Sequence, residues 1–520
     1  MKVSFAANSV SYVVECSGKG QVRMGNTWWE RAARGYLLAP TRTVALVAGG
    51  LGLALAATSV AAAGPWQGGE RVAELRPRPA APDQDAAHSS KPQVMAVPAP
   101  SWQPAPDVLL PAAGSTDAAA PVPDPAALAA ALGGGLSAPA LGQVTASVVD
   151  VATGRSLYAS GPDVAQTPAS TNKIATATAA LTLLGPQHRF TTRVVTAAGG
   201  RIVLVGGGDP TLTAAPTGGT DPQASLATLA DRTAAALRAE GTATVSLGYD
   251  ISLFTGSPLH PIGVNDNIAL VQALTVDEGR IDPASTEDAP RYSDPAATAA
   301  ADFARLLGAR GITVQGAPAQ VTAPAAATAP GTTALAEVQS QPLAEIVERM
   351  LTNSDNDIAE TLGHQVALAA GMPATFSGGA AAVLRTLRGL GVRLGATRLY
   401  DSSGLDGQDA IPADVLTQLL ALAASPARPQ LRPVVVGLPV AGFTGTLGPG
   451  VEGFASGAGL GLVRAKTGSL STVNTLAGLV VDHDGRLLAF AFMSNGSGGA
   501  ATARSALDVL AGRVAACGCR

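Results

Sequence analysis

Short blocks of alternating hydrophobic and polar residues begin near residue 126 and continue to the end of the chain. Among them, residues 143–160 form two apolar stretches around Ala152–Thr153–Gly154, which predicts a β-hairpin. Residues 464–496 predict three more strands, the last two joined by a hairpin loop over Asp482–Gly485. Because strands are expected at both ends of this region and helices between them, we predict an α+β fold in which helices cover an antiparallel sheet.

Helical patterns lie between these two groups of strands. In residues 168–185, a proline and a serine lead into an Ala/Leu-rich stretch that ends at Gly185. Residues 341–370 predict two helices with a break at Thr352–Asn356. Residues 201–212 predict a short buried strand followed by a glycine turn, which lacks the spacing and the lysine of a phosphate-binding loop.

The N-terminal part of the chain has a different pattern. Residues 43–63 carry no charge and are numerous enough to cross a bilayer as a helix. Residues 1–42 are biased toward basic side chains, so we expect this segment to be cytoplasmic and everything after residue 63 to lie outside. Small residues at Ala61–Ala63 also fit a cleavage site, so a signal peptide is the alternative to a transmembrane anchor. Both interpretations predict an extracytoplasmic protein.

Proline is concentrated between this segment and the first predicted strand. Residues 64–125 are rich in Pro and Ala, and 13 prolines fall within residues 65–125. Such a stretch buries too little apolar surface to offset chain entropy and favours extended conformations. We therefore predict a disordered linker over residues 64–125 that holds a domain away from the membrane.

The composition argues against several classes of function. The formal net charge of −4 argues against a nucleic-acid partner, which normally requires a basic field. The three cysteines and five histidines are too scattered to suggest a metal site, so we expect neither metal nor cofactor. Only five lysines occur in the chain, and two of them, Lys173 and Lys466, follow residue 91.

Lys173 belongs to an S-x-x-K sequence that starts with Ser170 at the beginning of a predicted helix. Residues three apart on a helix share one face, so the amine can reach the hydroxyl. A serine hydroxyl needs a neighbouring base to act as a nucleophile, and a desolvated lysine can supply it. Taken alone, the pattern is also that of a helix-cap serine beside a solvated lysine.

Lys466 begins a K-T-G sequence at the start of a predicted strand. Lys466, Thr467, Gly468 and the following Ser469 place a cation, hydroxyls and a bare backbone along one edge. This arrangement can bind a substrate carboxylate while the glycine lets a peptide approach the main chain. A lysine that merely guards a strand edge is the alternative.

A third sequence, S-x-N, lies between the two lysines at the predicted helix break. Ser354 and Asn356 could place a second hydroxyl and an amide in the same cleft, although an ordinary helix cap would look similar. S-x-x-K, S-D-N and K-T-G together are the set found in class A β-lactamases and penicillin-binding proteins. This combination points to acyl transfer through a serine.

Beyond these motifs, residues 140–500 resemble the class C low-molecular-mass penicillin-binding proteins, peptidase family S13. The resemblance is also carried by blocks at 204–212, 249–254, 349–362, 400–406, 438–447 and 464–478. It implies a penicillin-binding-protein/β-lactamase-like transpeptidase fold with large domains inserted between S-x-x-K and S-x-N. On this basis we expect a catalytic domain at 126–195 and 335–520, and accessory domains at 196–334.

The resemblance implies a D-Ala-D-Ala carboxypeptidase or endopeptidase that trims peptidoglycan through an acyl-enzyme and is inhibited by β-lactams. Roles follow for the motif residues: nucleophile (Ser170), base (Lys173), proton relay (Ser354), orienting amide (Asn356), carboxylate binding (Lys466, Thr467), backbone approach (Gly468), oxyanion binding by backbone N–H groups (Ser170, Ser469) and binding of a substrate side-chain amine (Asp250).

The chain departs from the family pattern at Asp357, at Gly363–His364, and in lacking an arginine soon after its G-T-L sequence at 445–447. Two other functions remain open. A β-lactamase or esterase could use the same scaffold, although the class A E-x-x-L-N loop is not found. A wall-binding adaptor without activity would also fit the long linker.

Overall fold

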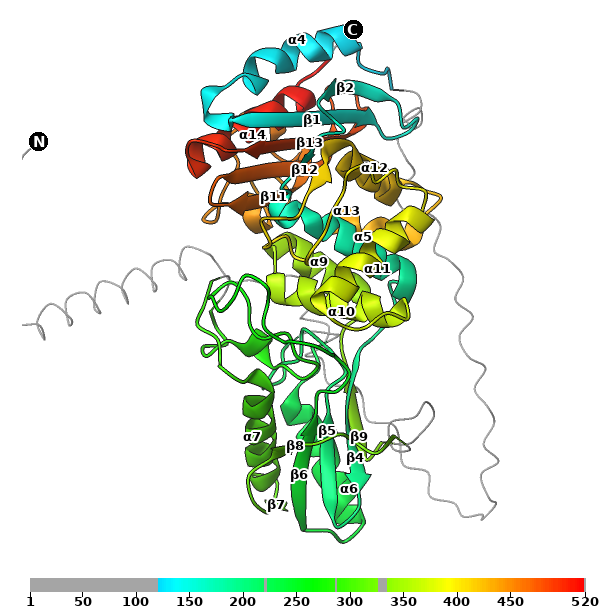
Figure 1. Ribbon diagram of the computed structural model, residues 1–520, viewed down its shortest axis with the longest axis vertical. Coiled ribbons are helices and arrows are strands. Elements are labelled where there is room, and N and C mark those ends of the chain that lie inside the picture. Colours follow the sequence, from blue (N-terminus) through cyan, green and yellow to red (C-terminus); the bar gives the residue numbers. More distant parts are fainter. Residues whose placement is uncertain (1–119, 219–221, 286–287, 326–333, 519–520) are drawn as a thin grey trace, which may run out of the picture. The chain divides into compact units, whose positions relative to one another are not determined.

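The computed structural model describes residues 120–218, 222–285, 288–325 and 334–518 (Figure 1). All of them belong to one compact unit, Ala105–Arg520. The predicted segments 1–42 and 43–63, and the predicted linker up to residue 119, lie outside the described residues. No helix in the described ranges has both the length and the apolar character needed to cross a bilayer.

The predicted antiparallel sheet is confirmed. It has five strands in the order β11-β12-β13-β1-β2, and every neighbouring pair is antiparallel. The two N-terminal and three C-terminal strands are β1 (Gln143–Asp150), β2 (Ser156–Ser160), β11 (Val463–Leu470), β12 (Val473–Val481) and β13 (Leu487–Asn495). Strand β11, which carries K-T-G, therefore lies at one edge of the sheet.

The first and last of these sequence segments meet at the centre of the sheet. Strand β1 pairs with β13 along its whole length, from Gln143 opposite Asn495 to Asp150 opposite Leu488. At the end of this pairing, Arg486 Nε and Nη2 donate to the two Asp150 oxygens at 2.6 and 2.7 Å. Both side chains are buried, and the bidentate geometry satisfies both charges.

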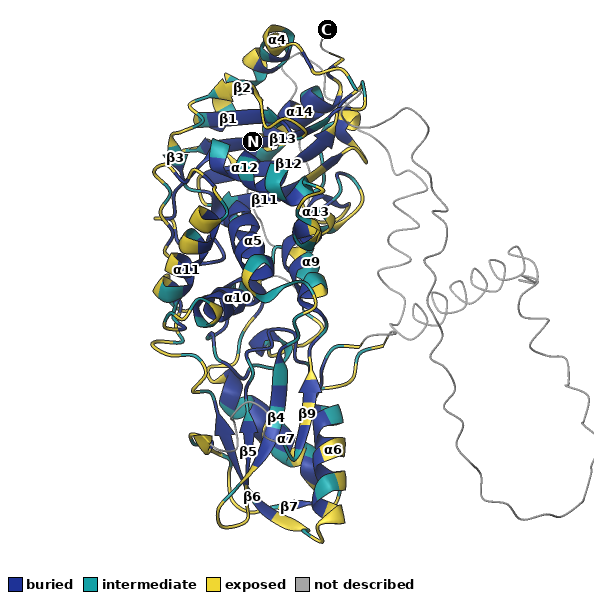
Figure 2. Ribbon diagram, turned by 90° about the vertical axis from the view of Figure 1, so that its right-hand side faces the viewer, coloured by how far each residue is buried: buried dark blue, intermediate teal, exposed yellow. Residues whose placement is uncertain are grey.

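Alternation along β12 and β13 provides two apolar faces. On one face, Leu476, Phe490 and Phe492 pack against α4 (Pro125–Leu136) and α14 (Ala500–Ala515). Figure 2 shows these central strands as buried over their length. Because both faces are covered, the strands read as continuous hydrophobic runs and not as simple alternation.

The other face of the sheet packs on a helical layer. Ala477 and Met493 contact α5 (Lys173–Leu184) and α12 (Ala413–Ala424) in one continuous core. The predicted break in 341–370 is confirmed, since one helix ends at Asn353 and the next begins at Asn356. The remaining helices of this layer are α9 (Leu343–Asn353), α10 (Asn356–Ala369), α11 (Phe376–Gly389) and α13 (Arg432–Val436).

A second sheet lies in the sequence between S-x-x-K and S-x-N. Its order is β7-β6-β5-β4-β9, with β8 paired to β6. The first strand starts at Thr191 and the last ends at Gln339, so this sheet extends five residues beyond the predicted 196–334 at each end. Its elements are β4 (Thr191–Ala197), β5 (Arg201–Val205), α6 (Leu226–Ala239), β6 (Thr244–Asp250), α7 (Pro295–Gly308), β7 (Thr313–Val314), β8 (Ala319–Gln320) and β9 (Ala336–Gln339).

The described residues between β6 and α7, 251–285 and 288–294, form an irregular segment that we call the docking segment. It contains one 3-10 turn and contacts α10 of the helical layer, as the hydrogen bond from Ala269 N to Asp357 shows. The short elements are β3 (Ala165–Gln166), β10 (Ile411–Pro412) and the 3-10 turns η1 (Pro139–Leu141), η2 (Ala169–Asn172), η3 (Asp277–Gly279), η4 (Pro429–Leu431), η5 (Gly445–Leu447) and η6 (Gly457–Gly459).

Candidate active site

Ser170 lies in η2, the 3-10 turn that leads directly into α5. The preceding residue, Ala169, has φ 47°, a left-handed conformation that is costly for a residue with a side chain. A Cβ on Gly404 would come within 1.9 Å of the Ala169 carbonyl oxygen, so the chain presses closely on this turn. Tight packing thus holds Ser170 in a strained turn, as is common for residues at functional sites.

Lys173 is fully buried behind Ser170. Its Nζ lies 2.8 Å from Ser170 Oγ, 2.7 Å from Asn356 Oδ1 and 2.8 Å from the Ser403 carbonyl oxygen. A neutral amine has two N–H bonds and one lone pair. When the two carbonyl oxygens accept the N–H bonds, the lone pair is left facing the Ser170 hydroxyl, which is the geometry of a nucleophile and its base.

The charge state of Lys173 favours the same role. Burial lowers the pKa of Lys173 to about 8, because the ammonium form loses its hydration. The nearby carboxylates of Asp401 and Glu360 oppose this effect. The neutral amine is therefore accessible close to neutral pH.

The S-x-N sequence forms the turn between α9 and α10. Ser354 adopts φ 62° at the end of α9, and Asp355 caps α10 through Ile358 N at 3.0 Å. Asn356 uses both ends of its amide, since Oδ1 contacts Lys173 and Nδ2 donates to Asn267 O at 3.1 Å. The structure thus brings Asn356 to the lysine and leaves Ser354 half-buried at the turn beside it.

Lys466 is also fully buried, on edge strand β11. Its Nζ donates to the Thr467 carbonyl oxygen at 2.9 Å, while Thr467 Oγ1 lies 2.9 Å from Thr446 Oγ1. Burial, and secondly the charge of Lys173, hold the pKa of Lys466 well below its usual value. An arriving carboxylate would reverse this shift and restore the positive charge.

Gly468 explains how β11 approaches the nucleophile. A Cβ at this position would lie 2.2 Å from Thr475 Oγ1, 2.7 Å from Pro168 O and 3.0 Å from Ser170 N. Only a residue without a side chain fits there. The glycine of K-T-G therefore allows strand β11 to lie against the turn that carries Ser170.

A pocket of about 280 Å³ adjoins the K-T-G strand. Thr467 and Ser469 line one side, and Arg504, from helix α14, lines another. Ser469 Oγ is buried and has no hydrogen-bond partner among the described residues, so it is available to a ligand. The sequence analysis did not identify Arg504, which follows K-T-G by more than 30 residues and belongs to no motif.

Asp250 lies at the end of β6 in the second sheet and is buried. Its two carboxylate oxygens accept hydrogen bonds from Ser252 N at 2.7 Å and Ala323 N at 2.6 Å. These contacts stabilise the chain around β6. Its contact with a substrate amine stays a prediction.

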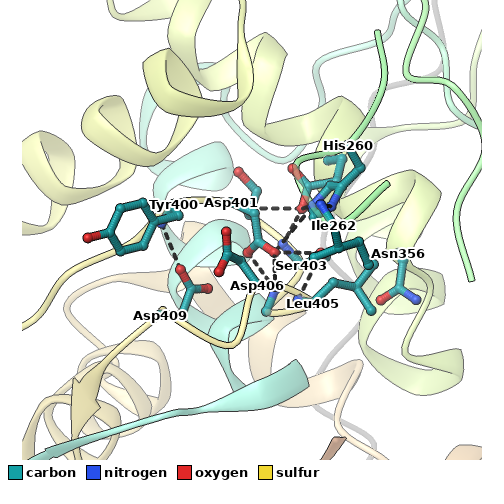
Figure 3. Close-up of polar contacts among 12 residues, drawn as sticks. His260, Ile262, Asn356, Tyr400, Asp401, Ser403, Leu405, Asp406 and Asp409 are labelled. Carbon is teal, nitrogen blue, oxygen red and sulfur yellow. Dashed lines mark hydrogen bonds and ion pairs between the residues drawn. The ribbon is translucent and has the colours of Figure 1, made fainter. Parts of the chain in front are cut away.

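The loop 401–406 forms a support behind Lys173 that the motifs did not reveal. Glu360 Oε1 accepts the N–H groups of Ser402 and Ser403 at 3.0 and 2.7 Å. Asp401 accepts those of Gly404 and Asp406, both at 2.7 Å. These two carboxylates thereby hold the backbone that presents the Ser403 carbonyl oxygen to Lys173, as Figure 3 shows for Asp401 and Ser403.

The departures from the family pattern have local packing reasons. A Cβ at Gly363 would lie 2.0 Å from Ser402 Oγ, so α10 needs a glycine where it meets loop 401–406. The His364 ring stacks near Phe376, and burial lowers its pKa, which favours a neutral ring. Asp357 pairs with Arg291 of the docking segment at 2.9 Å.

Two groups of acidic and histidine side chains have ligand atoms within 4.8 Å of one another. Backbone N–H groups and arginines already occupy many of these oxygens, including Glu278, which is bonded to both Arg280 and Arg349. We therefore assign a metal ion to neither group. Their members are His260, Glu360 and Asp401 in one, and Glu278, Asp355 and Asp357 in the other.

Comparison with known proteins identifies close relatives of the sequence. A family model described as the D-Ala-D-Ala carboxypeptidase 3 (S13) family matches residues 128–290 and 285–515. Carboxypeptidase DacB of Mycolicibacterium smegmatis is 39% identical over 416 residues, covering 78% of this chain and 87% of the relative. A D-alanyl-D-alanine carboxypeptidase of Actinomadura is 31% identical over 432 residues, covering 68% and 78%.

The fold is also that of a solved structure. The crystal structure of penicillin binding protein 4 from Haemophilus influenzae matches with a TM-score of 0.59 at 22% identity, covering 74% of this chain and 97% of that one. This confirms the predicted fold class, including a helix-covered sheet interrupted by an insertion.

Proposed function

Because the chain belongs to the D-Ala-D-Ala carboxypeptidase 3 (S13) family, we propose that it cleaves the terminal D-Ala-D-Ala bond of peptidoglycan stem peptides with Ser170 as nucleophile. It is a serine-type carboxypeptidase that acts in the cell envelope. The observation that supports the residue assignment is the position of Lys173 Nζ, 2.8 Å from Ser170 Oγ with its other two contacts on carbonyl oxygens. That arrangement leaves a lone pair for proton transfer.

The first step is acylation. Lys173 Nζ takes the proton of the Ser170 hydroxyl while Oγ attacks the carbonyl carbon of the penultimate D-Ala. The negative charge that develops on the carbonyl oxygen is met by the backbone N–H groups of Ser170 and Ser469. Gly468 allows the main chains of Ser170 and Ser469 to lie close together, because β11 and η2 approach each other at its position.

The tetrahedral intermediate then collapses. The C–N bond breaks, and the leaving D-Ala amine takes a proton that passes from Lys173 through the Ser354 hydroxyl. Asn356 holds Lys173 in place and binds the substrate amide. Water next attacks the acyl-enzyme, with Lys173 again as base, and releases the shortened peptide. Cleavage of a cross-link at the same D-Ala carbonyl uses the same residues, so the proposal includes endopeptidase activity.

Recognition of the C-terminal carboxylate belongs to the K-T-G end of the site. Lys466 and Thr467 supply a cation and a hydroxyl, and Arg504 adds a second cation to the adjoining pocket. The carboxylate of a β-lactam imitates this group, so these drugs should acylate Ser170 and remain attached.

Intact-mass spectrometry after brief penicillin exposure tests the assignment. We expect one stable adduct that maps to Ser170 and is absent from Ser170→Ala. Turnover of penicillin without an adduct would indicate a β-lactamase instead. A folded protein with neither adduct nor turnover would indicate an adaptor and would contradict the proposal.

We also propose that residues 43–63 export the enzyme, as a retained anchor or a cleaved signal. The support is the uncharged run of 21 residues behind a basic segment. Mass analysis of the mature N-terminus distinguishes the two, and an enzyme retained in the cytoplasm would contradict both.

A further inference from the structure

The inserted region takes part in building the catalytic centre. Its docking segment accepts a hydrogen bond from Asn356 through Asn267 O and donates one to Asp357 through Ala269 N. A third contact comes from His260, whose buried ring lies between two acidic side chains of the catalytic domain. Of these three, only His260 brings a titratable side chain to the support of Lys173.

His260 Nε2 lies 3.4 Å from Asp401 Oδ2 and 3.6 Å from Glu360 Oε1, and Figure 3 shows the ring beside loop 401–406. Among the described residues, His260 Nε2 has no hydrogen-bond partner other than these two nearby carboxylates. Buried polar atoms are rarely left without partners, so this ring and this pair of carboxylates depend on each other.

The ring carries a proton on Nε2. Its other nitrogen, Nδ1, accepts the Ile262 N–H at 3.3 Å, which in a neutral ring places the proton on Nε2. Burial and the acceptor role of Nδ1 favour a neutral ring, whereas the carboxylates of Asp401 and Glu360 raise the pKa of His260. In the neutral and the charged form alike, an N–H bond therefore points at the two carboxylates.

These carboxylates connect His260 to the proposed base. Glu360 holds the N–H groups of Ser402 and Ser403, and Asp401 holds those of Gly404 and Asp406. The Ser403 carbonyl oxygen in turn contacts Lys173 Nζ at 2.8 Å. The negative charges of the two carboxylates also oppose the lowering of the Lys173 pKa. A donor that binds them affects both the position and the protonation of the lysine.

We propose that His260 is a positioning residue for catalysis: its Nε2–H, supplied by the inserted region, binds and orients the Asp401–Glu360 pair that holds Lys173 ready as a base. The inference rests on the proposed role of Lys173. Under this proposal the inserted region supplies a residue that supports the active site.

Other titratable groups surround this arrangement. On the His260 side, Asp409 lies behind Asp401, and burial together with the Asp401 charge raises its pKa to about 10, so it is protonated at neutral pH. His364 faces His260 from α10 and favours the neutral form. The groups that face Lys173 are Asp355 and Asp357 from the α9–α10 turn and Lys466 from β11. None of these groups occupies the position of His260 between the two carboxylates.

The test compares His260→Phe, which keeps a ring against Phe376 but removes the donor, with His260→Gln, which keeps an N–H donor. The rate of penicillin acylation is measured from pH 5.5 to pH 9.5. For His260→Phe we expect the midpoint of the rising limb to move up by about one pH unit and the rate at pH 7 to fall about tenfold. For His260→Gln we expect a midpoint within about 0.3 units of the wild type.

His364→Phe is the ring-packing control, because its ring contacts the same Phe376 and its Nδ1 meets the Glu360 main-chain oxygen and not the carboxylate. It should keep the wild-type midpoint. The proposal is overturned by an unchanged midpoint in His260→Phe, by an equal shift in His260→Gln, or by an equal shift in His364→Phe. A wild type that forms no adduct would instead overturn the proposed function.

A measurement on the wild type covers the case in which the variants do not fold. Nitrogen NMR of histidine-labelled protein should show His260 Nε2 protonated from pH 6 to pH 8.5. An unprotonated Nε2 in this range would overturn the proposal directly.

Discussion

The two buried lysines lie at opposite ends of one site and have very different surroundings. Lys173 Nζ has three close partners, and two of them are carbonyl oxygens. Lys466 Nζ donates to one carbonyl oxygen, that of the neighbouring Thr467, whose residue lines the pocket beside the K-T-G strand. The first amine is fully arranged before any substrate arrives, whereas the second lacks a counter-charge that a substrate carboxylate would provide.

Under the proposed roles, this difference separates chemistry from recognition. A base must be held with its lone pair aimed at one atom, so its positions are filled by protein groups. A carboxylate-binding site must keep donors unused until the ligand binds, and Ser469 Oγ is such a group. Variants at the two ends should therefore fail in different ways.

The largest loss is expected for Lys173→Gln. Without its amine, the Ser170 hydroxyl has no base, and the rate of penicillin acylation should fall by about 10³-fold. The rate of adduct formation by intact mass measures this, with circular dichroism as the control for folding. Acylation within tenfold of the wild-type rate would show that another group is the base.

Gly468→Ala should come next, because its Cβ would collide with Pro168 O and Thr475 Oγ1 and push β11 away from Ser170. Displacement of this order should slow acylation by about 10²-fold. Gly498→Ala is the matched control, since nothing lies within 4 Å of its Cβ position. Equal rates in the two variants would refute the close approach.

Lys466→Gln should reduce recognition more than chemistry. For a peptide that ends in a free carboxylate, we expect kcat/KM to fall by about 10- to 100-fold, mostly through KM. The same peptide with an amide terminus serves as the comparison and should lose much less. Equal losses on both peptides would mean that Lys466 does not bind the carboxylate.

The pH dependence of the wild type tests the same base without a substitution. Lys173 acts as a base only when neutral, so acylation should rise about tenfold per pH unit below its pKa. It should level off near pH 8, the value to which burial lowers that pKa. Stopped-flow acylation between pH 6 and pH 9 measures this, and a flat profile would assign the base elsewhere.

The catalytic motifs could be predicted because each is a local signal. Ser170 and Lys173 are three residues apart, and Gly468 follows Lys466 directly, so spacing alone indicates their chemistry. The sequence signals for the hairpins and for the helix break before Asn356 are equally local. The structure then brings the Lys173 and Asn356 side chains to 2.7 Å although 183 residues separate them.

Other parts of the site depend on tertiary packing and have no local signal. His260 faces a glutamate 100 residues later in the chain, and a lone histidine in an irregular segment indicates no partner. Arg504 reaches the pocket only because α14 covers the sheet. Strand β9 has no local signal either, since it is four residues long and is defined by its pairing with β4.

The pairing of β1 with β13 has a kinetic consequence. Strand β1 can pair only after β13 is available, and the two are far apart in the chain: Asp150 and Arg486, at the end of this pairing, are 336 positions apart. Contacts of such long sequence separation make folding slow, since the loop must close before the contact forms. The sheet that carries K-T-G is thus completed late, once the C-terminal strand β13 has paired with β1.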